Sequence, residues 1–307
     1  MKKILKLITA ATLVSTLVFG MVGCKTKDEP KTDEANKKVG IVVSTLNNPF
    51  FVQMKEGAEE KAKDLGYELV VLDSQNDPAK ERSNVEDLVQ QGVAAIVINP
   101  TDSDAVENAI KVANEAKIPV ITVDRAANGG EVVSHIASDN VAGGELAAEY
   151  ILEQLGDTAD IKLVELQGIP GASATNDRGA GFHNIVDDKE GITVVSSQAA
   201  DFDRQKGLTV TENIIQAQPE FHAIFAHNDE MALGAVKALK ASNRNVIVVG
   251  FDGNDDAIDA VNAGEMAATV AQQPKLMGEI AIMNAVKTST GETVDAQIPV
   301  DLALIKK

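Results

Sequence analysis

Short apolar runs alternate with amphipathic segments along most of the chain, and this alternation constrains the fold more than any other feature. The first run, Val39 to Val43, is rich in β-branched residues, as is typical of a strand buried on both faces. After it, Phe51, Met54 and Ala58 recur at helical spacing, with charged residues on the other side. Strands that alternate with helices in this way form parallel sheets wound by helices. The sequence therefore predicts an α/β fold built on doubly wound parallel sheets.

The same pattern predicts the position of each element. The predicted strands cover residues 39–44, 68–73, 94–98, 119–123, 133–137, 161–166, 192–196, 222–226, 245–250 and 266–270. The predicted helices cover residues 50–64, 78–91, 103–116, 140–155, 174–186, 203–216, 229–241, 254–263 and 273–290, with Asp102 and Ser103 as an N-cap for the third. About ten strands fit two lobes better than one sheet. At 307 residues, the chain is long enough for two cores.

An internal repeat supports the prediction of two lobes. Residues 95–125 and 223–253 both run strand, Asn, helix, strand, Asp, with 25 positions from Asn99 to Asp124 and 24 from Asn228 to Asp252. One βαβ unit used in each lobe would place polar groups at the same edge of each sheet. The alternative is that any two βαβ units look alike at this level of detail.

Polar and aromatic residues gather where the predicted strands end, and Arg178 and Phe202 lie at or near predicted helix or strand starts. Ligands of open α/β sheets bind at the carboxyl ends of the strands. Amide, carboxylate and guanidinium groups can pair with vicinal hydroxyls, and aromatic rings can cover the C–H faces of a sugar. The candidate residues are Asn48, Phe50, Phe51, Asp124, Arg125, Arg178, Phe202, Asn228, Phe251, Asp252 and Gln272. The alternative is that the rings belong to the core and the charges to surface ion pairs.

Several classes of function find no support in the sequence. The net charge of −18 argues against nucleic-acid binding, which needs a basic footprint. No Walker loop, Gly-x-Gly-x-x-Gly after a strand or Gly-x-Ser-x-Gly elbow is present. The four histidines lack metal-ligand spacing. Asp102, Asp104 and Glu107 fit the first turn of a helix better than a metal site. We expect no cofactor, no metal and no catalytic residue.

The N-terminal residues are typical of an exported protein. Residues 1–23 combine three lysines with an uncharged apolar run, which predicts a signal peptide. The signal ends in Gly-Cys and resembles a bacterial lipobox, although Met21 stands where Leu is usual; the resemblance implies lipidation of Cys24. An incidental cysteine is the alternative. Residues 24–37 are charged and lack apolar periodicity, which predicts a disordered tether.

Together these motifs resemble a known family. Val-Ser-Thr-Leu-Asn-Asn-Pro-Phe-Phe at 43–51, Asn-Asp-Glu-Met-Ala-Leu-Gly-Ala at 228–235 and Val-Val-Gly-Phe-Asp-Gly at 248–253 are similar to the bacterial periplasmic ribose-binding proteins. The resemblance extends from about Lys38 to Lys307. It implies the type I periplasmic binding fold, with an N-terminal lobe of residues 38–139 and 273–301 and a C-terminal lobe of residues 140–272 and 302–307. The three-segment hinge would lie near residues 139–140, 272–273 and 301–302.

The resemblance also implies a function. A monomer with no enzymatic activity would capture D-ribose between the lobes, through the eleven candidate residues, and deliver it to the permease of an ABC importer. A chemoreceptor is a further candidate partner. A lipid on Cys24 would anchor the protein to the outer face of the membrane, as in a Gram-positive cell. Three alternatives remain: a receptor for allose or a furanosyl autoinducer, a sugar-responsive transcription regulator, and an exported enzyme. The regulator needs a DNA-binding N-terminus, where this chain carries a signal.

Overall fold

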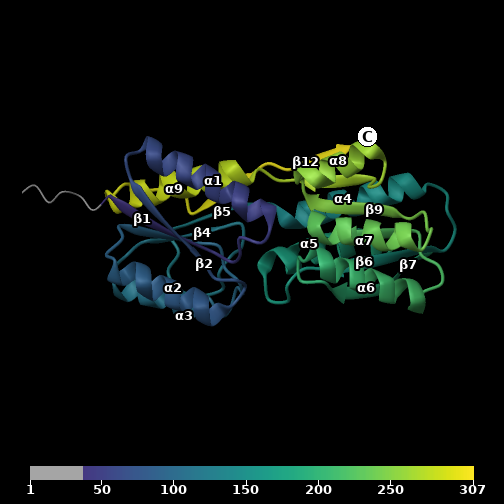
Figure 1. The fold of residues 1–307 in the computed structure, drawn as a ribbon, viewed down its shortest axis with the longest axis horizontal. Helices are drawn as coiled ribbons and strands as arrows, with labels where there is room; N and C mark the ends of the chain where they lie inside the picture. The colour runs from purple at the N-terminus through teal and green to yellow at the C-terminus, as the bar shows by residue number, and fades with distance from the viewer. Residues whose placement is uncertain (1–36) are drawn as a thin grey trace, which may run out of the picture. The chain divides into compact units, whose positions relative to one another are not determined.

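The structure is a computed structural model that describes residues 37–307. The predicted signal peptide, Cys24 and the predicted tether up to residue 36 lie outside the described residues. Within residues 37–307 the chain forms two sheets, each with helices on both faces (Figure 1). We call each sheet with its helices a lobe. Among the described residues, no helix has both the length and the apolar character needed to cross a membrane.

The N-terminal lobe contains a six-stranded sheet in the order β11-β5-β4-β3-β1-β2, and all its strand pairs are parallel. Its strands are β1 (Lys38–Val43), β2 (Glu68–Asp73), β3 (Ala95–Ile98), β4 (Val120–Val123), β5 (Ser134–Ser138) and β11 (Gln297–Val300). Its helices are α1 (Pro49–Asp64), α2 (Pro78–Gln90), α3 (Glu107–Glu115) and α9 (Pro274–Ser289). α1 and α9 cover one face and α2 and α3 the other (Figure 1). Each face therefore has its own apolar core.

The C-terminal lobe repeats this winding, with the sheet order β12-β10-β9-β8-β6-β7. Its strands are β6 (Ile161–Gln167), β7 (Ile192–Ala199), β8 (Ala223–Ala226), β9 (Ile247–Asp252), β10 (Ala268–Ala271) and β12 (Ala303–Lys306). Its helices are α4 (Asn140–Leu155), α5 (Ser173–Val186), α6 (Arg204–Ala217), α7 (Asp229–Ala241) and α8 (Asp255–Ala263). α4 and α5 pack on one face, and α6, α7 and α8 on the other. The predicted α/β fold with parallel sheets is confirmed.

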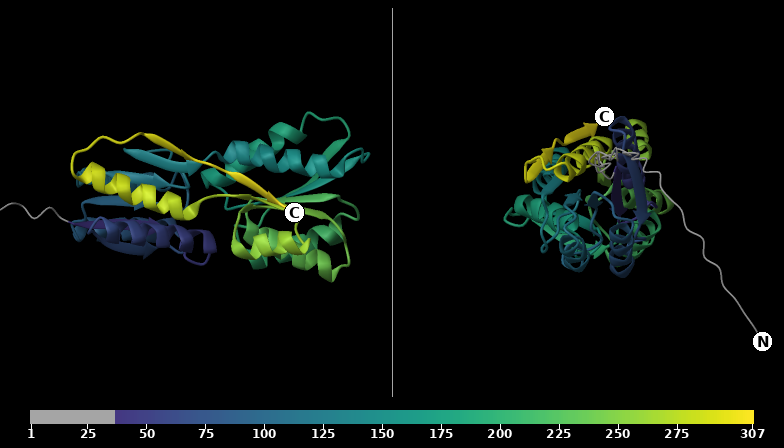
Figure 2. Two further views of the ribbon diagram at one scale, coloured as in Figure 1. Left: turned by 90° about the horizontal axis from the view of Figure 1, so that it is seen from above. Right: turned by 90° about the vertical axis from the view of Figure 1, so that its left-hand side faces the viewer.

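The last two strands, β11 and β12, were not predicted. They follow one another along the chain, separated by Asp301 and Leu302, yet they belong to different sheets (Figure 2). β11 pairs with β5 in parallel, whereas β12 pairs with β10 in antiparallel fashion. The chain leaves the N-terminal lobe and enters the C-terminal one without reversing, so it must run against the strands of the second sheet. Both strands lie at sheet edges, where Pro299 is tolerated, and this proline and their short length conceal them in the sequence.

The prediction for the third helix is partly wrong. The sequence predicts a helix over residues 103–116 with Asp102 and Ser103 as its N-cap, but α3 begins at Glu107. Asp102 does use its side chain as a cap: Oδ1 accepts hydrogen bonds from the backbone N–H groups of Asp104 and Ala105. These bonds close a turn ahead of the helix. Ser103 is free to take part in a different contact, described below.

The structure contains the internal repeat, but the register that matches the two units differs by one residue from the predicted register. The backbone N–H of Asn99, the first residue after β3, donates to Val42 of β1. The equivalent bond after β8 runs from His227, not Asn228, to Leu166 of β6. With Asn99 matched to His227, the distance along the chain to Asp124 and to Asp252 is 25 residues in both lobes. The two lobes therefore share one βαβ unit with identical spacing.

Candidate functional site

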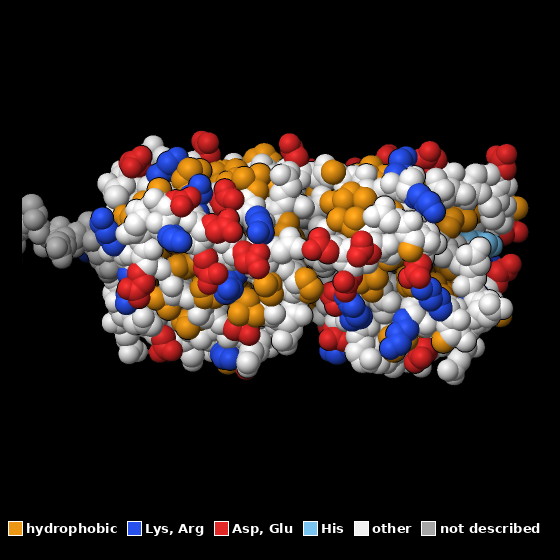
Figure 3. Space-filling model, turned by 45° about the horizontal axis from the view of Figure 1, so that its top comes forward, with side chains coloured by type: hydrophobic (Ala, Val, Ile, Leu, Met, Phe, Trp, Pro, Cys, Tyr) orange, Lys and Arg blue, Asp and Glu red, His pale blue; other side chains and the backbone are white. Residues whose placement is uncertain are grey.

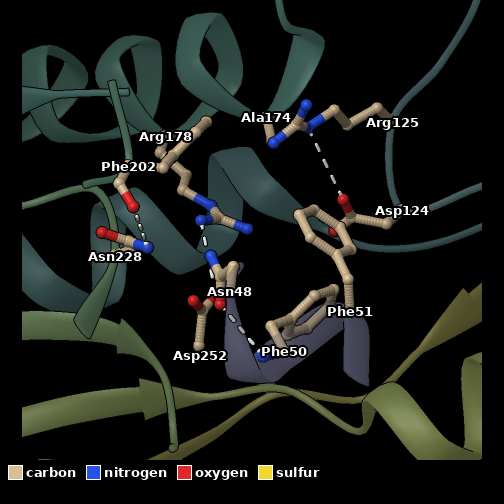
Figure 4. Close-up of a pocket in the computed structure, with 10 residues that line it drawn as sticks. All are labelled: Asn48, Phe50, Phe51, Asp124, Arg125, Ala174, Arg178, Phe202, Asn228 and Asp252. Carbon is tan, nitrogen blue, oxygen red and sulfur yellow. Dashed lines mark hydrogen bonds and ion pairs between the residues drawn. The ribbon is translucent and has the colours of Figure 1, made fainter. Parts of the chain in front are cut away.

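A cavity of about 220 Å³ lies between the two lobes, at the carboxyl ends of their strands (Figure 4). It is lined by Asn48, Phe50, Phe51, Asp124, Arg125, Ala174, Arg178, Phe202, Asn228 and Asp252. Nine of these are residues that the sequence predicts for the site. Ala174 was not predicted, because an alanine carries no chemical signal of its own.

The start of α1 places an amide and two rings on the N-terminal side of the cavity. Asn48 is the N-cap of α1, and its Oδ1 accepts a hydrogen bond from the N–H of Phe50 at 3.0 Å. This bond fixes the amide, so its NH₂ group stays available at the cavity. The rings of Phe50 and Phe51 meet edge to face, with centroids 5.2 Å apart. Both rings are nearly inaccessible to solvent, which gives the cavity a rigid apolar wall.

Asp124 and Arg125 follow β4 on the same side. Asn99 donates from Nδ2 to Asp124 Oδ2 at 3.1 Å, which ties the carboxylate to the end of β3. Arg125 donates from Nη1 to the carbonyl of Pro100 at 3.2 Å. Its guanidinium lies 5.2 Å from the centroids of both Phe51 and Phe202, one ring from each lobe. Arg125 is therefore clamped between the lobes.

Arg178 and Asp252 form the charged pair of the C-terminal side. Arg178, on α5, donates from Nε to Asn140 Oδ1 at 2.8 Å and from Nη1 to the carbonyl of His227 at 2.6 Å. Its Nη1 also lies 3.6 Å from Asp252 Oδ1. Asp252 is the last residue of β9. These contacts hold a guanidinium and a carboxylate side by side at the cavity wall (Figure 4).

Asn228 and Phe202 complete that wall. Asn228 is the N-cap of α7, where its Oδ1 accepts from the N–H of Met231 at 3.0 Å. Its Nδ2 donates to the carbonyl of Phe202 at 3.4 Å. The ring of Phe202 covers Gly168, where an added Cβ would lie 2.0 Å from the ring. The glycine therefore lets this aromatic side chain lie flat against the β6–α5 loop.

Phe251 and Gln272, also predicted for the site, lie behind the cavity and are not among the residues that line it. The Phe251 ring lies under the Arg178 guanidinium, 3.8 Å from its centre. Gln272 donates from Nε2 to Asp252 Oδ1 at 2.9 Å. Both residues contact lining residues, so they support the charged pair from behind.

The electrostatics of the cavity follow from its burial. Arg125 and Arg178 are 3 % exposed, and burial lowers the pKa of both guanidinium groups, against the nearby aspartates. Burial likewise raises the pKa of Asp252 to about 7, although Arg178 opposes the shift. When both aspartates are ionised, Asp124 and Asp252 match the two positive charges of Arg125 and Arg178. Such an array offers both hydrogen-bond donors and hydrogen-bond acceptors to a neutral polar ligand.

Three residues at the cavity have strained backbones. Asp124, Phe202 and Asp252 have φ angles of 63°, 58° and 116°, in a region that residues with side chains rarely adopt. Each such conformation costs on the order of 1–3 kcal/mol and persists only where the surroundings enforce it. All three side chains reach the cavity, so the strain coincides with the candidate site.

The two lobes also contact each other directly beside the cavity. The N–H of Ser103 donates to the carbonyl of Gly171 at 3.0 Å, and the N–H of Ser173 donates to Ser103 Oγ at 3.1 Å. The N–H of Ala126 donates to Ser173 Oγ at 2.9 Å. Ser103 and Ala126 belong to the N-terminal lobe, and Gly171 and Ser173 to the C-terminal lobe. We call these three bonds the closure contact.

The described residues contain no group of histidine, cysteine and acidic side chains that could hold a metal ion. The acidic residues considered in the sequence have other partners: Asp102 caps a turn, and Glu107 pairs with Lys111 at 2.7 Å.

On the face shown in Figure 3, acidic and basic side chains are interspersed over both lobes.

Comparison with known proteins places the chain among solute-binding proteins. Residues 39–293 match the model of the periplasmic binding protein domain. The ribose import binding protein of Haemophilus influenzae is 55 % identical, covering 89 % of this chain and 92 % of the relative. That of Escherichia coli is 51 % identical over 100 % and 99 %, and that of Bacillus subtilis 48 % identical over 96 % and 98 %.

Solved structures agree with this placement. The myo-inositol binding protein of Caulobacter, bound to myo-inositol, superimposes with a TM-score of 0.85 at 32 % identity, covering 89 % of this chain and 94 % of the other. A solute-binding protein of Actinobacillus succinogenes with bound D-allose gives 0.82 at 32 % identity, over 88 % and 97 %. Proteins of this family work outside the cytoplasm as the substrate-binding components of ABC importers, and the predicted family is confirmed. This chain belongs to the periplasmic binding protein family.

Proposed function

We propose that the protein captures D-ribose in the cavity between its lobes and delivers it to the permease of an ABC importer. The observation that carries this proposal is the composition of the cavity: two aspartates, two arginines and two asparagines face one another between phenylalanine rings. Relatives at 48–55 % identity are named ribose import binding proteins. These two facts together support a pentose as the ligand of these side chains and a transport role for this chain.

The eleven predicted residues have distinct roles in this proposal. The rings of Phe50, Phe51 and Phe202 cover the C–H faces of the sugar. Asp124, Arg125, Arg178 and Asp252 bind its hydroxyls through charge-assisted hydrogen bonds, each worth roughly 1.5–3 kcal/mol net. Asn48 and Asn228 add amide donors, while Phe251 and Gln272 hold Arg178 and Asp252 in place. A sub-micromolar site requires roughly 8–10 kcal/mol in total. A few such bonds and the ring contacts reach that sum.

Closure of the lobes is the signal that the permease reads. Sugar contacts from both lobes exist together only in the closed arrangement, so the sugar shifts the equilibrium toward that arrangement. The lobes are residues 38–139 with 273–301 and residues 140–272 with 302–307. The hinge lies at 139–140, 272–273 and 301–302, where Gln273 donates from Nε2 to the carbonyl of Asp301 at 3.1 Å. Binding and release need no chemical step, and we propose that the protein acts as a monomer without enzymatic activity.

The test is calorimetric titration of residues 25–307 with D-ribose, D-allose, D-arabinose and myo-inositol. We expect ribose to bind most tightly, and Arg178→Ala and Asp252→Ala each to weaken it at least about tenfold, since each removes a charge-assisted bond. Arg82→Ala is the matched control, because Arg82 is exposed, pairs with Glu86 at 2.9 Å and does not line the cavity. Wild-type affinity in either cavity variant would refute the site. Preference for D-allose would favour the alternative of an allose receptor, which a solved relative with bound D-allose at 32 % identity supports. Adding a furanosyl autoinducer to the titration tests the other receptor alternative.

We further propose that residues 1–23 are removed and that a lipid on Cys24 anchors the protein outside a Gram-positive membrane. Cys24 is the single cysteine of the chain, and it follows a signal that resembles a lipobox. Residues 24–37 would then tether the folded part to the membrane. Fractionation of cells expressing the full chain tests this proposal. We expect wild-type protein in the membrane fraction and Cys24→Ala in the soluble exported fraction; equal partition of the two would refute the anchor.

A further inference from the structure

Glu165 is a buried acid that the proposed sugar site does not use. It lies on β6 with no exposed surface, and it is not among the residues that line the cavity. Its Oε2 accepts hydrogen bonds from Ser197 Oγ and from Gln167 Nε2, the latter at 3.0 Å. Its Oε1 lies 2.9 Å from His227 Nε2. A buried carboxylate with this many partners is held in one position.

The partners of Glu165 keep it ionised. Burial by itself would raise the pKa of its carboxyl group, but the hydrogen bonds from His227 and Ser197, together with charge attraction from His227 and His183, outweigh burial and lower the pKa to about 2. Room for this group comes from α5, where an added Cβ at Gly179 would lie 3.3 Å from Glu165 Oε1 and 3.4 Å from the His227 ring. A larger residue at this position would crowd the pair. The sheet and α5 therefore enclose the two side chains together.

The tautomer of His227 follows from its two ring contacts. The backbone N–H of Gly168 donates to Nδ1 at 3.4 Å, so Nδ1 is the acceptor. The ring proton is then on Nε2 and is donated to Glu165. Burial lowers the pKa of His227 in spite of the nearby carboxylate, which keeps the ring neutral at pH 7. The imidazole thus links the β6–α5 loop to Glu165 through two hydrogen bonds.

The main chain of the same residue contacts a residue that lines the cavity. The carbonyl of His227 accepts the 2.6 Å bond from Arg178 Nη1, and the next residue, Asn228, lines the cavity. In the N-terminal lobe the equivalent residue, Asn99, holds Asp124 with its own side chain. In the C-terminal lobe the side chain points away from the cavity, to Glu165, and only the carbonyl faces the arginine. One residue therefore contacts Glu165 with its side chain and Arg178 with its carbonyl.

We infer that Glu165 and His227 are a positioning pair, which sets the guanidinium of Arg178 for ligand binding through the His227 carbonyl. The inference rests on the proposed function for the role of Arg178, and it adds two residues that touch no ligand. A purely structural role would be the alternative: the pair would then contribute to folding stability and leave the placement of Arg178 unchanged.

The first test measures ribose affinity in a mutant cycle. His227→Ala removes both ring contacts, whereas His227→Gln retains a donor for Glu165 and an acceptor for the Gly168 N–H. We expect His227→Ala to weaken ribose binding about tenfold and His227→Gln less than about twofold, as for loss and retention of a buried hydrogen bond. If His227→Ala does not fold, His227→Asn takes its place, because the asparagine amide is too short to reach Glu165. We expect His227→Asn to weaken ribose binding to the same extent. In an Arg178→Ala background, His227→Ala should weaken binding no further, because the effect acts through the arginine.

His222→Ala is the matched control. His222 precedes β8 as His227 follows it, and its Nδ1 also accepts from a backbone N–H, that of Lys162 at 2.9 Å. It lies at the opposite end of the strand from the cavity, so its loss should change ribose affinity less than about twofold. Equal weakening by His227→Ala in the wild-type and Arg178→Ala backgrounds would overturn the inference, as would wild-type affinity in His227→Ala.

The second test does not depend on which ligand binds. The Arg178 Nε–H is buried and bonded to Asn140, so its NMR signal should exchange slowly with solvent and disappear in Arg178→Lys. We expect its exchange to accelerate at least about tenfold in His227→Ala, and to stay at the wild-type rate in His227→Gln and His222→Ala. An unchanged rate in His227→Ala would overturn the positioning role even if ribose binds as proposed. If ribose does not bind at all, this measurement still decides the question.

Discussion

The closure contact predicts residues that set ligand affinity without touching the ligand. Ser103→Ala removes the acceptor of the Ser173 N–H, and Ser173→Ala removes the acceptor of the Ala126 N–H. Both bonds cross between the lobes. In an open arrangement these groups would bond to water, so the substitutions should raise the free energy of the closed arrangement alone.

The size of the effect follows from the number of bonds lost. A hydrogen bond contributes about 0.5–1.5 kcal/mol net, so each substitution should cost about 1 kcal/mol, or about fivefold in Kd. The two bonds are separate, so the double variant should lose about 2 kcal/mol, or roughly 30-fold. Because the contact must break before the sugar leaves, most of the change should appear as faster dissociation.

Stopped-flow fluorescence can measure the dissociation rate. The chain has no tryptophan and a single cysteine, Cys24, so a cysteine introduced on the surface of a Cys24→Ser protein can carry one fluorophore. Ser289→Ala is the control, because the Ser289 hydroxyl donates within its own helix, to Val286 at 2.7 Å. Urea unfolding without sugar should give the same stability for all three serine variants to within about 0.5 kcal/mol. Equal loss of stability and affinity, or unchanged affinity, would refute this reasoning.

Three further predictions concern other parts of the molecule. Gly278→Ala should destabilise the N-terminal lobe by about 1–3 kcal/mol or more in urea unfolding, because its Cβ would lie 2.0 Å from the carbonyl oxygen of Met54 where α9 crosses α1; wild-type stability would contradict this packing. Gly168→Ala should displace the Phe202 ring and weaken ribose binding about tenfold by calorimetry, as loss of one ring contact would; an unchanged Kd would count against the role of that ring. Burial raises the pKa of Glu81 from 4.5 to about 7. The folded state therefore loses stability as the pH rises from 4.5 through 7 and Glu81 ionises. Glu81→Gln should therefore gain up to about 3 kcal/mol relative to wild type between pH 4 and pH 8, and a difference that is constant with pH would contradict the assigned shift.

The sequence alone predicted most of the fold and the place of most cavity residues. Strand and helix periodicities mark ten of the strands and all nine helices of the described residues, because buried parallel strands read as apolar runs. Asn48, Asp124 and Asp252 could be placed together because parallel strands bring their carboxyl ends to one edge. Nine of the eleven candidate residues line one cavity for this reason.

What the sequence did not reveal depends on contacts between distant segments. β11 and β12 form only where two sheet edges accept them, and Pro299 hides the first. The α3 start was misplaced because a turn closed by Asp102 precedes the helix and frees Ser103 to meet Ser173 across the lobes. Ala174 lines the cavity only because α5 approaches it.

The residues behind the cavity show the same division most clearly. Glu165 and His227 lie 62 positions apart, and nothing local to either links it to Arg178. Their connection exists because β6 and β8 are neighbours in the sheet and α5 closes over both. The sequence by itself determines which residues reach the edge of each sheet, since that depends on local periodicity. Only the tertiary structure decides which side chains support them from behind and which bonds join the lobes, since these depend on how separate layers pack.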